Sequence, residues 1–167
     1  MKKILKSIGL ILLAALVIIQ FFHPAKNIAA VPSVHHIGKL YAVPANVEQI
    51  LVKACYDCHS NNTKYPWYSK IQPVDWWLND HIKEGKRKFN FAEFTTYRIA
   101  RQYKKLDECI NQVKDGEMPL ESYTLIHKNA ILTDAEKEAL FVWCETVRDS
   151  IKAKYPADSL VLPKRKK

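Results

Sequence analysis

Two cysteines and a histidine stand close together in the first half of the sequence, as Cys55, Cys58 and His59. Two thiols three residues apart lie about one turn from each other on a helix. At that spacing each thiol can add across one of the two vinyl groups of a haem and form a thioether. The imidazole that follows is then held beneath the iron as its proximal ligand. The pattern C-x-x-C-H therefore predicts one covalently attached c-type haem.

Other uses of the cysteines fit the sequence less well. A thioredoxin-like C-x-x-C site needs a βαβ context, which the sequence does not predict. A zinc site needs a second pair of ligands, whereas Cys109 and Cys144 stand singly. A disulfide between Cys55 and Cys58 would leave His59 without a role. Cys109 and Cys144 fall on or beside predicted helix stripes, where a disulfide between them and two buried free thiols are equally consistent.

A haem iron bound by histidine on one side commonly takes methionine or a second histidine on the other. Met118 is the only methionine after the first residue, and it stands in a Gly-Glu-Met-Pro turn. Gly116 can end the preceding helix, and Pro119 can stiffen the loop that presents the sulfur. We therefore expect Met118 to be the distal iron ligand. His81 and His127 are the alternative ligands.

Helices must position these residues, since the chain has only four glycines, too few for a many-turned β fold. Apolar side chains recur at helical spacing before the attachment motif and after the Met118 loop. We expect a mainly α fold, a small cytochrome c-like helical domain around one covalent haem. The expected helices run from an N-cap at Asn46 into Cys55, from 74 to 84 between Pro73 and Gly85, from Thr95 or Thr96 to about Asp115, and from 134 onwards behind a capping box of Thr133 and Glu136.

Aromatic residues are frequent between the attachment motif and the third expected helix. Haem is a large, flat, apolar ligand, so some of these side chains must line it and exclude water. Trp67 and Trp77 are predicted to be haem-contacting residues, and the others are predicted to belong to the core. The aromatic residues of this stretch are Tyr65, Trp67, Tyr68, Trp76, Trp77, Phe89, Phe91 and Phe94.

The first residues have the order of an export signal, because Lys2, Lys3 and Lys6 precede an apolar run from 8 to 22. A helix from 4 to 22 would be about 28 Å long, close to the thickness of the hydrocarbon core of a membrane. No good cleavage site follows, which favours an uncleaved single-pass anchor over a removed signal peptide. Basic residues stay in the cytoplasm, so we expect the haem domain in the bacterial periplasm, held at the inner membrane or, after cleavage, free of it.

The net charge of +9 lies mainly at the two ends of the chain, where Lys2, Lys3, Lys6 and residues 164–167 are basic. The part between them is nearly neutral, which excludes the basic stripe of a nucleic-acid-binding domain. His35 and His36 fall in a proline-punctuated stretch and are interpreted as solvated linker residues. The expected organisation is a signal-anchor over 1–24, a linker over 25–45, a haem-binding domain over 46–155 and a basic tail over 156–167.

Several motifs together resemble the small bacterial haem-binding domain family of exported single-haem proteins. The attachment motif alone would be generic, but the runs Tyr-Pro-Trp-Tyr at 65–68 and Pro-Val-Asp-Trp-Trp at 73–77 are distinctive. The resemblance covers about residues 35 to 150. It implies covalent haem c at Cys55 and Cys58 with ligation by His59, and it implies little about biological role.

The sequence therefore favours a membrane-tethered monohaem cytochrome that passes single electrons to or from a redox partner, with no catalytic residues of its own. Two filled axial positions would leave the iron no place for a substrate. One alternative is a haem-based sensor or gas-binding module, in which the sixth ligand is displaceable. A haem peroxidase is less favoured, since it needs an open iron and distal acid–base residues.

Overall fold

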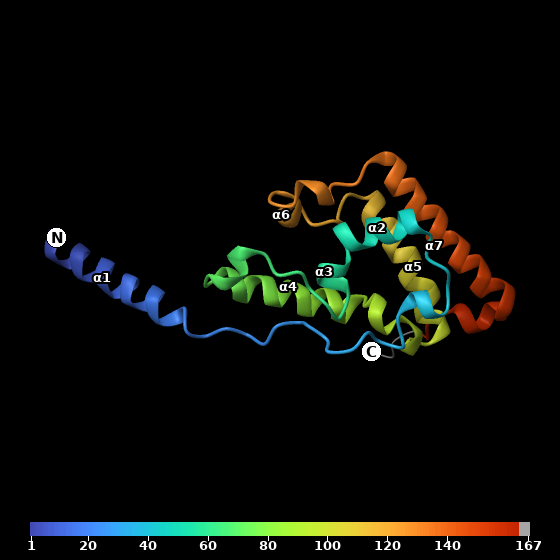
Figure 1. Ribbon diagram of the computed structural model, residues 1–167, viewed down its shortest axis with the longest axis horizontal. Helices are drawn as coiled ribbons and strands as arrows, with labels where there is room; N and C mark the ends of the chain where they lie inside the picture. Colours follow the sequence, from blue (N-terminus) through green and yellow to red (C-terminus); the bar gives the residue numbers. More distant parts are fainter. Residues whose placement is uncertain (164–167) are drawn as a thin grey trace.

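The computed structural model describes residues 1–163, which form helices joined by short loops (Figure 1). This range contains no β-strand, only an isolated antiparallel bridge between Ile28 and Asn62. The predicted mainly helical class is confirmed, and residues 164–167 of the predicted basic tail lie outside the described part. The α-helices are α1 (Lys2–Ile19), α2 (Ala45–Ala54), α3 (Tyr56–His59), α4 (Val74–Lys88), α5 (Ile99–Lys114), α6 (Glu121–Thr124) and α7 (Asp134–Lys154). The 3-10 helices are η1 (Ile37–Lys39), η2 (Trp67–Lys70), η3 (Phe91–Thr96), η4 (Lys128–Ala130) and η5 (Ala157–Leu160).

The core lies where α2, α5 and α7 pack on one another, at the end of the body away from α1 (Figure 1). The predicted capping box begins α7, because the Thr133 hydroxyl accepts from the Glu136 N–H and the Glu136 carboxylate accepts from the Thr133 N–H. The apolar stripe expected on this helix is buried throughout. Its residues are Leu140, Trp143, Cys144, Val147 and Ile151.

Two helix starts differ from the sequence prediction. The N-cap of α2 is Pro44, so Asn46 lies inside the helix and its side chain caps nothing. The N-cap of α5 is Arg98, because Thr95 and Thr96 belong to η3. There the Thr95 N–H donates to the carbonyl of His35, a tertiary contact that no local pattern encodes.

α4 continues four residues beyond its predicted end at Glu84 and includes Gly85. A Cβ atom at Gly85 would lie 2.6 Å from the main-chain oxygen of Cys58. This glycine therefore does not end the helix. It lets α4 approach α3 more closely than any other residue would allow, and so brings the end of α4 against the attachment motif.

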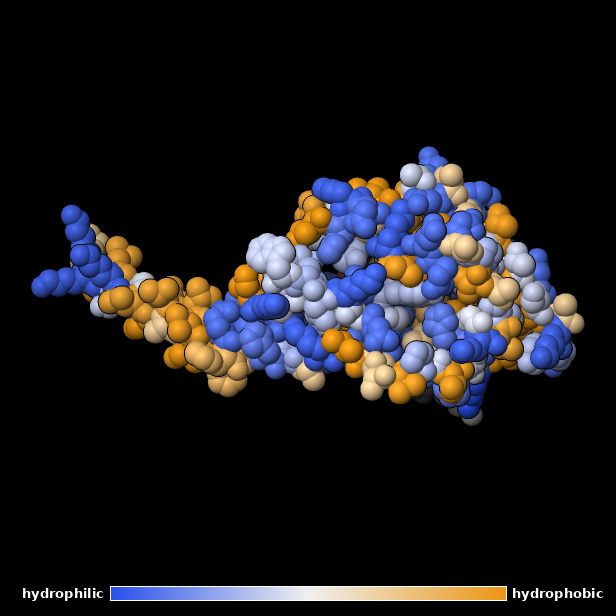
Figure 2. All heavy atoms as spheres, in the orientation of Figure 1, coloured by the Kyte–Doolittle hydropathy of each residue, from blue (hydrophilic) through white to orange (hydrophobic). Residues whose placement is uncertain are grey.

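α1 extends away from the body and buries none of its residues (Figure 1). Three lysines stand near its start, and an apolar stretch follows them. Figure 2 shows this stretch as a hydrophobic arm. Among residues 1–163, no helix is both long and apolar enough to cross a membrane. The predicted spanning anchor is thus not found in the described part of the chain.

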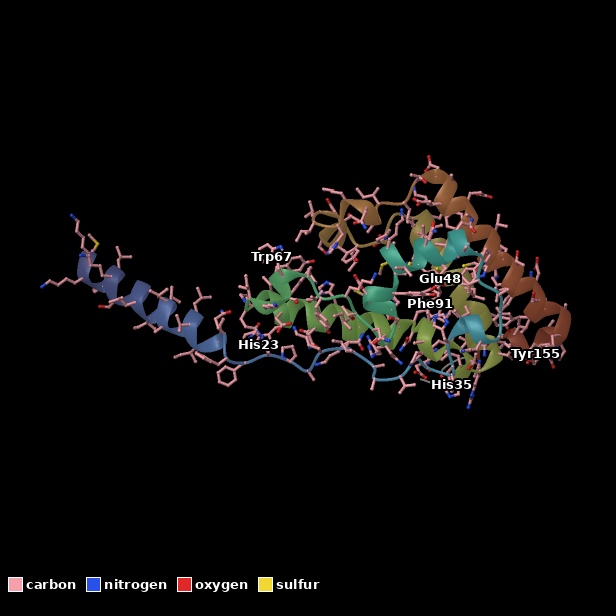
Figure 3. The ribbon with its side chains drawn as sticks, in the orientation of Figure 1. His23, His35, Glu48, Trp67, Phe91 and Tyr155 are labelled. Carbon is pink, nitrogen blue, oxygen red and sulfur yellow. The ribbon has the colours of Figure 1, made fainter. Side chains whose placement is uncertain are left out.

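The chain that follows α1 is bonded to the start of α4. The carboxylate of Asp75, which is 1% exposed, lies 2.7 Å from the Lys26 ammonium and 2.7 Å from His23 Nδ1. The buried side chain of Gln72 donates to the carbonyl of Phe22, and its main-chain N–H donates to the side chain of Gln20. The first residues of the predicted 25–45 linker are therefore held on the body through Lys26. They lie at the end of the body where Figure 3 labels His23 and Trp67.

Candidate functional site

The attachment motif forms one helical turn. Cys55 ends α2, and its carbonyl accepts from the N–H groups of Cys58 at 3.2 Å and His59 at 2.9 Å. The two thiols are consequently presented about one turn apart, as the spacing predicted. Cys55 and Cys58 are both free thiols in the structure.

Two adjoining cavities open beside this turn. The larger is about 360 Å³ and the smaller about 240 Å³, and each lies within or near the range of small-ligand sites. Cys55 lines the larger cavity and Cys58 the smaller. His59 and Met118, which are far apart in the sequence, lie in the wall of both. The residues shared by the two walls are Ala54, His59, Lys88, Met118 and Pro119.

The imidazole of His59 is fixed in a metal-binding orientation. Its Nδ1 lies 2.8 Å from the main-chain oxygen of Phe89. Because a carbonyl oxygen can only accept, Nδ1 carries the hydrogen, and the lone pair remains on Nε2. Burial lowers the pKa of His59, so the ring is neutral at pH 7 and Nε2 is free to bind a metal.

The loop that carries Met118 begins where the sequence predicted. α5 ends at Lys114, and Gly116 follows with φ of 77°, the left-handed conformation that favours glycine. The N–H of Met118 donates to the carbonyl of Gln112 at 3.0 Å, which folds the loop back onto the end of α5. The Met118 side chain is half-buried, packs against the core and faces the two cavities.

The two alternative histidine ligands lie in different places. His127 lines neither cavity: its Nε2 is 2.7 Å from the Tyr68 hydroxyl, and its ring stacks on that of Tyr123 at 4.3 Å. His81 does line the smaller cavity, together with His59 and Met118. Its Nδ1 lies 2.8 Å from the Trp77 carbonyl, so its Nε2 also keeps a lone pair. The structure therefore brings His81, and not His127, into a cavity wall with His59 and Met118.

The predicted haem-contacting tryptophans are not among the wall residues. Trp67 is 75% exposed at the start of η2, and Trp77 is 45% exposed on α4, where it lies against the ring of His81 at 4.1 Å. Phe89 and Phe91 supply the aromatic wall of the larger cavity instead. These two follow α4 directly, and its extension past Gly85 is what carries them to the site.

Asp57 and Tyr123 are site residues that motif reasoning overlooked. The Tyr123 hydroxyl donates to the Asp57 carboxylate at 2.8 Å, and both side chains line the smaller cavity. This bond joins the attachment turn to α6, which follows the Met118 loop. The sequence does show Asp57 as an acid within the C-x-x-C-H motif, but its partner Tyr123 is 66 residues away along the chain.

The other two cysteines lie beside the site. Cys109 lines the larger cavity and Cys144 is buried behind it in the core. Both are free thiols in the structure, which therefore contains no disulfide between them. A hydrogen bond that the Cys144 thiol donates to Cys109, together with burial, raises the pKa of Cys144 well above its ordinary value. Burial also raises the pKa of Cys55, and that of Cys58 to about 11.

The donors around the cavities suit a haem. An imidazole nitrogen and a thioether sulfur are axial ligands that iron takes in c-type haems. Two thiols lie at the edge, and apolar side chains, all but Ala54 buried, cover the larger cavity. These apolar wall residues are Ala54, Phe89, Phe91, Val113 and Leu132.

Comparison with protein families finds one match, a family described as the haem-binding domain, over residues 14–146. The matched region includes the attachment turn, the Met118 loop and the walls of both cavities. Comparison with curated proteins and with solved structures finds no match.

Proposed function

Since the chain belongs to the haem-binding domain family, we propose that it is a monohaem c-type cytochrome that carries single electrons. Cys55 and Cys58 would hold the haem through two thioether bonds. His59 would be the proximal iron ligand and Met118 the distal one. Haem, when bound, supplies a one-electron couple at its iron.

One observation carries this proposal: His59 and Met118 lie in the wall of the same two cavities, with one thiol of the motif in each. His59 offers Nε2, because Nδ1 is bonded to the Phe89 carbonyl. Met118 offers its sulfur from a loop tied to the end of α5. With both axial positions filled by the chain, no position remains for a substrate, which favours an electron carrier over a peroxidase.

The thiols are set up for attachment and not for oxidation. Burial raises the pKa of Cys58 to about 11, and it raises that of Cys55 further. Both sulfurs are therefore protonated at neutral pH, a form that reacts slowly with disulfides and oxidants. Attachment would add the S–H of each cysteine across one vinyl group of the haem. The sulfur would bond to one vinyl carbon, and the hydrogen would go to the other.

We propose further that α1 holds the protein at the periplasmic face of the bacterial inner membrane, beside an unidentified redox partner. Three lysines at the start of α1 and an apolar stretch in which no residue is buried support this. If α1 holds the protein at the membrane, the full chain should stay with membranes after a high-salt wash. Recovery of mature protein that begins in the 25–32 region would instead support a cleaved export signal.

The attachment proposal is tested on purified full-length protein. Haem should stay with the polypeptide through denaturation and acid–acetone extraction, and the double variant Cys55→Ala, Cys58→Ala should lose it. The matched control is Cys109→Ala with Cys144→Ala, which removes the other two thiols and should keep the haem. Covalent haem in the Cys55, Cys58 double variant would overturn the proposal.

A sensor or gas-binding module is the second candidate, because His81 and Met118 line the same cavity and the wall so offers two possible sixth ligands. A displaceable sixth ligand would let carbon monoxide bind the ferrous protein. An optical spectrum that carbon monoxide leaves unchanged, with a near-infrared methionine-to-iron band, supports the electron carrier. A carbon monoxide adduct of the unmodified protein supports the sensor.

A further inference from the structure

Two lysines stand in the walls of the haem cavities, which also hold the acids Asp57, Glu84 and Glu108. Lys88 is the last residue of α4 and lines both cavities, and Lys105 lies in α5 and lines the larger. They are the only lysine or arginine residues among the described wall residues.

Each of these lysines pairs with an acid that also pairs with a second basic residue. Lys105 lies 2.5 Å from Glu108, whose other carboxylate oxygen lies 3.3 Å from Lys104. Lys105 is only 18% exposed, whereas Lys104 is 55% exposed and lies outside the cavity. If Lys105 turns to another anion, Glu108 therefore remains neutralised.

The same arrangement recurs on α4. Lys88 lies 3.3 Å from Glu84, and Arg87 lies 2.6 Å from the same carboxylate. The Lys88–Glu84 pair is largely exposed and therefore contributes little to stability. Lys88 is free to exchange partners at low cost, because Arg87 continues to neutralise Glu84.

Haem brings two carboxylates with it, the propionates on the edge of the porphyrin away from the vinyl groups. A carboxylate beside apolar side chains needs a cation or hydrogen-bond donors. We propose that Lys88 and Lys105 bind the two propionates, and so fix which way the haem edge faces once the thioethers are made. This inference rests on the proposed haem site.

The test uses full-length, haem-loaded protein. Lys88→Ala and Lys105→Ala should each lower the equilibrium constant for haem reduction by about tenfold, the order expected when one charge is removed near a partly buried redox centre. The vibrational bands of the propionate carboxylates should shift in both variants. The matched controls are Lys83→Ala on α4 and Lys114→Ala on α5, which remove the same charge from exposed positions outside both cavity walls and should change neither readout.

Lys105→Arg keeps the charge and should restore the reduction potential. Equal shifts in Lys105→Ala and Lys114→Ala would overturn the proposal, since they would report net charge alone, and so would unchanged propionate bands. A wild-type protein without covalent haem would instead refute the attachment. The two failures are therefore distinguishable.

Discussion

The Nδ1 atom of His59 lies 2.8 Å from the main-chain oxygen of Phe89, 30 residues further along the chain. The bond decides which ring nitrogen faces the cavity. It exists because α4 runs past Gly85, against the Cys58 carbonyl, and ends at Lys88, directly before Phe89. The proximal ligand is thus oriented by a main-chain group on another helix, which no side-chain substitution at Phe89 removes.

His59→Ala should remove the proximal ligand while leaving both thiols. We expect covalent haem with a high-spin or mis-ligated absorbance spectrum, because the cavity offers no other imidazole in that position. His127→Ala is the control: His127 is bonded to Tyr68 outside the cavities, so its loss should leave the spectrum unchanged. A wild-type spectrum in His59→Ala would show that another residue is the ligand.

Met118→Ala should open the distal position. The spectrum should shift towards high spin, carbon monoxide should bind the ferrous form, and the reduction potential should fall, because a thioether favours ferrous iron over water or nitrogen ligands. His81→Ala is the comparison, since His81 lines the same smaller cavity. If His81→Ala changes the axial spectrum and Met118→Ala does not, the distal ligand is His81.

Gly85→Ala should weaken the packing of α4 on the attachment turn. The added methyl group would lie 2.6 Å from the Cys58 oxygen, a main-chain atom that cannot move aside cheaply. We expect a loss of about 2 kcal/mol in the free energy of unfolding, measured by denaturant titration followed at the haem absorbance. Gly9→Ala, where the new atom meets nothing within 4 Å, is the control. Equal stability of the two variants would contradict the close approach.

Lys26→Ala should leave the buried Asp75 carboxylate with the His23 ring as its remaining side-chain partner. The free energy of unfolding should fall by ~2 kcal/mol, the order of a hydrogen bond to a charged group. Lys70→Ala removes a fully solvated charge from η2 nearby and should have no measurable effect. If both variants are as stable as the wild type, the segment after α1 is not part of the folded body.

Local sequence was sufficient for features that depend on neighbours along the chain. The C-x-x-C-H spacing gives one helical turn with two thiols, Gly116 ends α5 through its positive φ, and Thr133 with Glu136 begins α7. Each of these is settled by main-chain geometry within a few residues, where the residue types leave few alternatives. The same holds for the buried stripe of α7.

Tertiary contacts decided what the sequence left open. Whether Met118, His81 or His127 faces the attachment turn depends on how distant helices pack, and so does the choice of Phe89 and Phe91 over Trp67 and Trp77 as wall residues. Gly85 reads as a helix end in the sequence, yet it is a contact point in the fold. The periodic pattern states which face of a helix is apolar, but burial of that face against a particular neighbour is a property of the whole chain.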